Sequence, residues 1–258
     1  MHNAEAEGRK VFRDKTKGVS YFKGKLLGTG GFAKCYEAIS EQDGRLYAAK
    51  VIPKKSINEK RQRYKLLIEI KIHKALKHKH IVEFLDAFED KENIYILLEY
   101  CRNYTLKDLA KRRKRLTELE TRVYISQIVK AMIYIHSQGI IHRDLKLGNV
   151  LINDQMDTKI CDFGLSTKIK SEGDAKKTIC GTPNYIAPEI LEEHGHSYEV
   201  DIWSIGVIMF ALLFGKPPYE DSTVEQTYEN IKGNKYSFPP HIEVSRSAKD
   251  LIAKILVM

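Results

Sequence analysis

Two short polar motifs constrain this chain more than any other feature of its sequence. Residues 142–149 are His-Arg-Asp-Leu-Lys-Leu-Gly-Asn, and residues 162–164 are Asp-Phe-Gly. The first motif supplies the carboxylate of Asp144, an ammonium group and the amide of Asn149, and the second places the carboxylate of Asp162 beside a glycine that permits a turn. A base with two oxygen ligands for Mg²⁺ is the set that phosphoryl transfer from ATP requires. Either motif alone can arise by chance, but the two together in this order predict that chemistry.

The composition is that of a soluble globular chain. Its 258 residues are 43% hydrophobic and 30% charged, which is enough for a large core or for two lobes. The four cysteines are widely spaced without a CxxC pair, so we expect free thiols in a reducing compartment. The longest apolar run, 202–214, is too short to cross a bilayer and predicts a buried helix. Residues 1–10 are polar and contain no secretory signal.

The formal net charge is +9, and the sharpest basic run is Lys111-Arg112-Arg113-Lys114-Arg115. We interpret this run chiefly as a solvated helix face and linker, with nuclear targeting or substrate steering as the alternative. No DNA-reading module accompanies it, so we do not expect nucleic acid as the main ligand.

The hydrophobic pattern divides the chain into two parts with different textures. Residues 1–18 are charged and predict a flexible leader. Residues 19–100 are mostly strand-like, with glycine hairpins at 28–31 and 43–44 and one helix marked by the apolar positions between 66 and 76. The predicted strands lie near 25–27, 34–39, 46–52, 81–84 and 94–98.

After a hinge at about residues 99–102, the pattern becomes mainly helical. Thr117 and Glu120 form a capping box at the start of a predicted helix over 117–137, which Gly139 ends. Short strands near 149–152 and 158–160 follow, and the apolar helix over 202–214 is stopped by a glycine and two prolines. The sequence therefore predicts an α+β fold with two lobes: a small antiparallel β-rich N-lobe with one main helix, and a larger, mainly helical C-lobe over 103–258.

A glycine-rich segment and a strand lysine add to the two motifs. Gly28-Thr29-Gly30-Gly31-Phe32-Ala33 lies between two predicted strands, where missing side chains let backbone N–H groups approach phosphates. Lys50 lies inside the apolar strand 48–52, where an ammonium group needs a partner, and Glu69 on the following helix is the natural one. A purely structural ion pair is the alternative.

The motif residues have distinct expected roles. Asp144 is the predicted base that orients a substrate hydroxyl and accepts its proton. Lys146 is placed to reach the γ-phosphate, and Asn149 and Asp162 are the predicted Mg²⁺ ligands. A turn residue at position 144 and an ordinary Asx turn at Asp162 are the alternatives.

These motifs together resemble the eukaryotic protein kinase family from about Tyr21 to the last residue. The resemblance also includes Ala187-Pro188-Glu189 and Asp201-Ile202-Trp203-Ser204, and Lys146 is typical of the serine/threonine branch. Ala33 stands where a third glycine is usual and Cys35 where valine is usual, and both departures are features of the polo-like kinases. The stretch from Lys176 to Glu189 also resembles the activation segment of that group.

The resemblance implies ATP and Mg²⁺ as cofactors and assigns further residues. Lys50 would hold the α- and β-phosphates, Leu98 would be the gatekeeper, and Thr178 would be the activating phosphosite with Arg143 and Lys168 as cationic partners of its phosphate. Thr182 would brace Asp144 and Lys146 and line the substrate pocket. The implied ATP-binding residues are Leu27, Gly28, Thr29, Gly30, Gly31, Phe32, Ala33, Cys35, Ala48, Lys50, Leu98, Glu99 and Cys101. Small apolar packing is the expected role of Cys35 and Cys161, with a reactive thiol as the alternative.

The resemblance also implies partners and places. We expect protein substrates with acidic residues near the target, an upstream activating kinase, a monomeric kinase domain and no membrane span. Location in the cytoplasm or nucleus, at centrosomes, spindles or basal bodies, is implied by the family alone.

The end of the chain departs from the family pattern. Residues 251–258 are an apolar stretch, whereas kinase folds continue with more helices and an arginine that pairs with the equivalent of Glu189; polo boxes are absent as well. We therefore expect a truncated C-lobe. The alternatives are a non-catalytic binding module with a kinase fold and a serine/threonine kinase of another subfamily.

Overall fold

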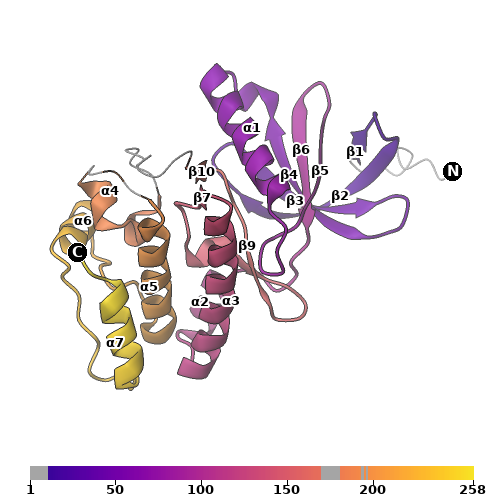
Figure 1. Cartoon of the computed structure of the whole chain (residues 1–258). Coiled ribbons are helices and arrows are strands. Elements are labelled where there is room, and N and C mark those ends of the chain that lie inside the picture. The colour runs from indigo at the N-terminus through magenta and orange to yellow at the C-terminus, as the bar shows by residue number, and fades with distance from the viewer. Residues whose placement is uncertain (1–10, 170–180, 193–194, 196) are drawn as a thin grey trace. The chain divides into compact units, whose positions relative to one another are not determined.

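The computed structural model describes residues 11–169, 181–192, 195 and 197–258. The chain forms two compact units (Figure 1). The first unit contains residues up to Lys77 and Val82–Arg102, and the second contains His78–Ile81 and Asn103–Met258. The short segment 78–81 therefore groups with the second unit, although the chain enters and leaves it from the first.

The first unit is a six-stranded antiparallel sheet with the order β1-β2-β3-β4-β6-β5. One helix, α1 (Lys60–Ala75), accompanies it. The strands are β1 (Val11–Asp14), β2 (Val19–Thr29), β3 (Lys34–Ser40), β4 (Leu46–Pro53), β5 (Phe84–Glu89) and β6 (Asn93–Glu99). Both predicted hairpins are present: 30–33 joins β2 to β3, and the β3–β4 turn contains Gly44 at φ +68°, a left-handed conformation that glycine adopts without strain.

Two expectations for this unit are wrong in detail. The flexible leader over 1–18 does not extend through residues 11–18, because Phe12 is buried and Asp14 accepts hydrogen bonds from the backbone and hydroxyl of Thr16, closing the β1–β2 turn. The strand expected at 81–84 begins only at Phe84. Ile81 instead forms an isolated bridge to Ile160 of the second unit.

The second unit consists mainly of helices. They are α2 (Leu106–Arg113), α3 (Glu118–Ser137), α4 (Pro188–Leu191), α5 (Glu199–Phe214), α6 (Val224–Lys232) and α7 (Arg246–Ile255). Two small antiparallel strand pairs accompany them: β7 (Ile140–Ile141) with β10 (Thr167–Lys168), and β8 (Val150–Ile152) with β9 (Thr158–Ile160). The α+β fold class with two lobes is thus confirmed.

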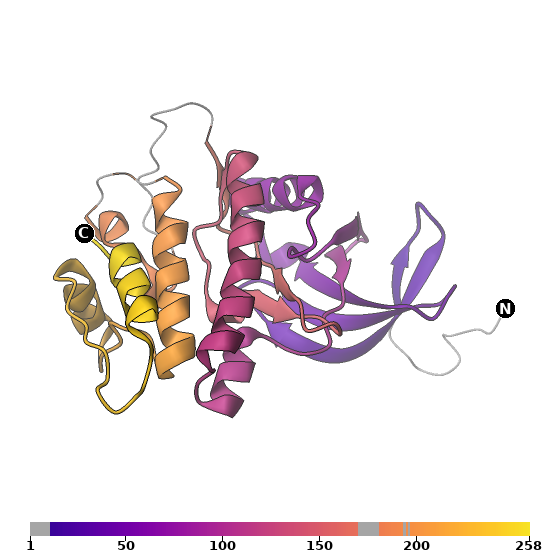
Figure 2. The same cartoon turned by 60° about the horizontal axis from the view of Figure 1, so that its bottom comes forward.

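Helices α3 and α5 lie side by side in the second unit (Figure 2). The predicted capping box starts α3, where Thr117 Oγ1 accepts from the N–H of Glu120 at 3.2 Å and Glu120 Oε2 accepts from the N–H of Thr117 at 2.9 Å. Helix α5 is buried along nearly all its length and ends at Gly215, φ +87°. At Gly206 an added Cβ would lie 2.6 Å from Ile255, so this glycine lets α7 pack closely on α5. Helices α3 and α5 support the segment that carries the polar motifs.

The basic run 111–115 is exposed throughout, as a solvated helix end. Arg113 pairs with Glu120 at 3.1 Å, and Arg112 lies over the ring of Tyr104. Within the described part of the chain, none of the helices has the length and apolarity that crossing a membrane would need.

Candidate active site

The first unit holds the glycine-rich segment at the end of a hairpin. The N–H of Gly30 donates to the carbonyl of Ala33 at 2.9 Å and closes the turn. Around Gly28 and Gly31, no atom lies within 4 Å of where a Cβ would be. The backbone therefore borders open space, and Leu27 and Phe32 are exposed beside it. Such a hairpin leaves room for a phosphate to approach main-chain N–H groups.

Lys50 and Glu69 form the ion pair that the sequence suggested. Lys50 Nζ lies 2.5 Å from Glu69 Oε1, with the two side chains 25% and 14% exposed. In the sheet Lys50 is in register with Cys35 on one neighbouring strand and Ile96 on the other. Strand β4 and helix α1 together fix the position of the ammonium group. Because the Lys50 side chain is partly buried, it has fewer accessible conformations than a surface lysine.

The other residues of this unit that the sequence predicts to bind the nucleotide lie on strands β3, β4 and β6 or just after β6. Ala48 on β4 is buried and faces Leu98 on β6 in register, and Glu99 donates its N–H to the carbonyl of Glu83. Cys101 follows the end of β6. Burial raises the pKa of the Cys35 thiol to about 11, so this side chain is a protonated, packed thiol at neutral pH.

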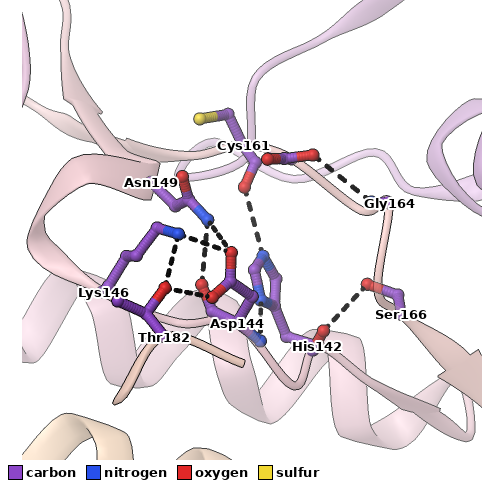
Figure 3. Close-up of polar contacts among 9 residues, drawn as sticks. His142, Asp144, Lys146, Asn149, Cys161, Gly164, Ser166 and Thr182 are labelled. Carbon is purple, nitrogen blue, oxygen red and sulfur yellow. Dashed lines mark hydrogen bonds and ion pairs between the residues drawn. The ribbon is translucent and has the colours of Figure 1, made fainter. Parts of the chain in front are cut away.

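The second unit gathers Asp144, Lys146, Asn149 and Thr182 into one hydrogen-bonded cluster (Figure 3). Asp144 is 9% exposed. Its Oδ1 accepts from the hydroxyl of Thr182 at 2.8 Å, and its Oδ2 lies 2.7 Å from Lys146 Nζ and 3.0 Å from Asn149 Nδ2. Lys146 also donates to Thr182 Oγ1 at 2.7 Å. Donors therefore hold both oxygens of the carboxylate and fix its orientation.

The local backbone places these side chains on one side. The turn Leu147–Asn149 follows Lys146 directly and returns Asn149 to Asp144, whose carbonyl also accepts from Asn149 Nδ2 at 2.9 Å. Thr182 lies 38 residues away, just before the short helical turn Pro183–Tyr185. Contacts across this distance cannot be read from sequence spacing.

A buried carboxylate beneath the cluster holds the backbone of the first motif. Asp201 on α5 is fully buried, and it accepts from the N–H of His142 and of Arg143, each at 2.9 Å. His136 Nε2 donates to the same carboxylate at 2.9 Å. Arg143 has φ +66°, a left-handed conformation that costs a non-glycine residue energy and that the hydrogen bond from its N–H to Asp201 helps to maintain.

Asp201 and His136 are the residues of the site to which sequence reasoning gave no role. In the sequence, Asp201 is marked only as part of a motif shared with the kinase family. The signal that could have found it is an aspartate at the start of a helix that is otherwise apolar, since a carboxylate buried there needs several donors.

The second motif lies beside the first. His142 Nε2 donates to the carbonyl of Cys161, and the His142 ring contacts the ring of Phe163, which is buried. Asp162 has φ +66° and accepts weakly from the N–H of Gly164 at 3.4 Å. The turn thus separates the apolar anchor Phe163 from the carboxylate of Asp162.

The oxygens of this unit suit a magnesium ion shared with a nucleotide. Asn149 makes its two side-chain hydrogen bonds through Nδ2, so its amide oxygen is available as a ligand, and Asp162 adds a carboxylate. Among the residues that the structure describes, no three His, Cys, Asp or Glu side chains gather as a metal cage. Mg²⁺ typically needs no such cage, because water and phosphate oxygens complete its coordination.

Some predicted residues remain outside this geometry. Thr178 lies outside the described residues, as does Cys180. Of the cations expected near Thr178, Arg143 Nε donates to the carbonyl of Leu165 at 2.8 Å, and Lys168 is exposed on β10. Cys35, Cys101 and Cys161 form no disulfides.

Comparison with known proteins identifies the class to which this fold and site belong. The sequence matches the protein kinase domain over residues 21–258, and the chain belongs to the protein kinase family. It is 56% identical over 239 residues to the probable serine/threonine-protein kinase CCRP1 of Zea mays. It is 51% identical over 236 residues to serine/threonine-protein kinase PLK1 of Xenopus laevis, and 51% identical over 244 residues to the cell cycle serine/threonine-protein kinase CDC5/MSD2 of Saccharomyces cerevisiae.

These matches cover 92%, 92% and 94% of this chain, respectively. They cover only 38%, 39% and 34% of the three relatives, so the chain spans well under half the length of each. The predicted resemblance to polo-like kinases is confirmed by these relatives.

Proposed function

We propose that this chain is a serine/threonine kinase domain of the polo-like type, which transfers the γ-phosphate of ATP to hydroxyls of protein substrates. The observation that carries the proposal is the Asp144 carboxylate, held by Thr182, Lys146 and Asn149. A buried carboxylate aimed by three donors is suited to orient one substrate hydroxyl and accept its proton.

In this proposal the steps of the reaction are divided among the residues of the candidate site. The substrate hydroxyl oxygen attacks the γ-phosphorus, its proton passes to an Asp144 oxygen, and the bond from the γ-phosphorus to the β-phosphate oxygen breaks so that ADP leaves. Lys146 neutralises charge that develops on the transferred group, and Lys50, fixed by Glu69, binds the α- and β-phosphates. The hairpin of residues 28–33 covers the phosphates, while Leu98, Glu99 and Cys101 border the adenine.

Asn149 and Asp162 would hold Mg²⁺ together with the phosphates. Bound there, the ion offsets the negative charge of the triphosphate. Their hard oxygen atoms support this assignment, and it needs no further ligand from the chain.

The proposed regulation and substrates rest on the resemblance to the polo-like kinases. We propose that phosphorylation of Thr178 by an upstream kinase activates the chain, because the phosphate adds about 1.5 to 2 negative charges near cations. The Thr182 segment would line the pocket for the target residue, and acidic residues near that target would suit a chain of net charge +9. We further propose monomeric action in the cytoplasm or nucleus, with cell-cycle structures as the place of work.

Transfer of labelled γ-phosphate from ATP to casein tests the proposal, with phosphoamino-acid analysis of the product. We expect phosphoserine and phosphothreonine from the folded chain, dependence on Mg²⁺, and loss of transfer in Lys50→Met. Lys91→Met removes an exposed lysine of the same unit and is the matched control. A folded chain that binds ATP and transfers nothing when phosphorylated on Thr178 would instead be a binding module.

A further inference from the structure

Helix α1 carries an exposed stripe that the proposed catalysis does not use. Its members are Lys60, Tyr64, Leu67, Lys71 and Lys74, spaced by four, three, four and three residues, so they share one face of the helix. We call these five residues the α1 stripe. Tyr64 is 65% exposed and Leu67 64% exposed, and the three lysines are exposed as well.

The opposite face of α1 is already used by the sheet. Leu66 is buried in a cluster with Ile52, Ile57 and Ile96, and His73 donates from its buried ring to the carbonyl of Val82. Glu69, the partner of Lys50, lies on this same face, three residues after Leu66 and four before His73. Packing of the helix therefore gives no reason for an aromatic and an aliphatic side chain to stand in solvent on the outer face.

The charges of the α1 stripe are uncompensated. Within the described part of the chain, Lys60, Lys71 and Lys74 form no ion pair. Over residues 55–63 the single acid is Glu59 at the N-cap, against cations at Lys55, Lys60, Arg61 and Arg63. The N-terminal end of a helix dipole is positive, so these cations are unfavourable beside it. An anionic group that binds there is attracted both by the dipole and by the basic side chains.

We propose that the α1 stripe is a docking surface for an acidic peptide segment carrying an apolar anchor. Along the helix, the residues of the α1 stripe are a cation, an aromatic, an aliphatic and two cations. This order complements a segment in which carboxylates flank one or two large apolar side chains. Leu67 and Tyr64 supply contact area and the lysines supply orientation and attraction at a distance.

Two other anionic partners fit the α1 stripe less well. An anionic membrane surface would need a broad apolar face, whereas only two large hydrophobic residues of α1, Tyr64 and Leu67, are exposed and cations surround them. A nucleic acid would use the lysines, but an aliphatic leucine at the centre adds nothing to phosphate recognition. The apolar centre therefore distinguishes the peptide from both.

The test measures binding by fluorescence anisotropy of a labelled peptide in which glutamates flank a phenylalanine and a leucine. The full chain should bind it, and Lys71→Glu with Lys74→Glu should weaken binding by about tenfold or more. Leu67→Ala should weaken it by about tenfold as well. Lys15→Glu with Lys91→Glu is the matched control, since both lysines are exposed in the same unit and off the helix, and it should bind nearly as the parent does.

Further arms decide between partners. The same peptide with lysines in place of glutamates should not bind, and added salt should weaken the acidic peptide. Equal binding by the Lys71 and Lys74 variant overturns the proposal. The proposal is also overturned if heparin or a phosphatidylserine vesicle binds through the lysines and Leu67→Ala changes the binding of no ligand. Because binding is measured directly and should persist in Lys50→Met, the result stands apart from whether the chain transfers phosphate.

Discussion

The carboxylate of Asp201 accepts a hydrogen bond from the backbone N–H of Arg143 at 2.9 Å, and Arg143 has φ +66°. The same carboxylate accepts from the N–H of His142. A conformation that the backbone of this loop would not hold by itself is thus tied to a buried carboxylate on helix α5. Asp144 follows this turn directly, so the direction of its carboxylate depends on Asp201.

Replacement of Asp201 by asparagine should impair turnover more than nucleotide binding. An amide has one acceptor oxygen instead of two, so one backbone N–H of the turn loses its partner, which costs about 1 to 3 kcal/mol. We expect kcat to fall by about tenfold or more, with the Kd for ATP nearly unchanged. Steady-state kinetics and nucleotide titration measure the two, with Asp250→Asn as the exposed control. Equal losses in binding and turnover would contradict this role.

Replacement of Glu69 by glutamine should weaken the hold on Lys50. The pair is half-buried, so the remaining ammonium group keeps a neutral acceptor but loses the opposite charge that fixes it. We expect kcat/KM for ATP to fall by about tenfold while the melting temperature changes little. Glu225→Gln on α6, an exposed glutamate, is the control. Unchanged kinetics would show that the pair is structural only.

Sequence reasoning found the site where its residues lie close together along the chain. The motif at 142–149 predicted Asp144, Lys146 and Asn149, because one short turn is enough to bring them together. The ion pair of Lys50 followed from a charge inside an apolar strand, which needs a partner nearby.

The parts that the sequence did not predict depend on long-range packing. Asp201 meets Arg143 across 58 residues, and only the packing of α5 under the turn brings them together. The strand Val11–Asp14 was missed because its polar sequence lacks a strong period, while pairing with β2 and burial of Phe12 stabilise it. Tertiary contacts outweigh local propensity in such short strands.

The partly buried carboxyl group of Glu189 should make the free energy of unfolding depend on pH. Burial raises its pKa above the ordinary value, and no lysine or arginine among the described residues pairs with it. Between the ordinary and the raised pKa the folded chain binds more protons than the unfolded chain, so this group lowers stability as pH rises through that window. The penalty is complete above the raised pKa.

Glu189→Gln should therefore stabilise this chain at neutral pH and have little effect at lower pH, where the carboxyl group is protonated. Because the side chain is only partly buried, we expect a rise in melting temperature of about 2 °C at pH 7. Thermal unfolding at several pH values measures it, with Glu225→Gln as the control. A variant that is less stable at pH 7 would reveal a stabilising partner for the carboxylate.

Cys35 should resist alkylation in the folded chain. With a pKa of about 11, only about one thiol in a thousand is ionised at pH 8, and the thiolate is the form that reacts. Mass spectrometry after brief iodoacetamide treatment should show Cys35 modified far more slowly in the folded than in the urea-unfolded chain. Rapid labelling of the folded chain would contradict the burial of this thiol.

The single-turnover rate of phosphate transfer in Asp144→Asn tests the central claim most directly. The asparagine keeps the size of the side chain and can still meet Thr182, yet it cannot accept the substrate proton. With the chain saturated with ATP and Mg²⁺, we predict that transfer to casein falls by at least about a hundredfold while ATP affinity stays within about twofold. Transfer at the parental rate, with the same affinity, would show that Asp144 is not the base and would contradict the account of the site.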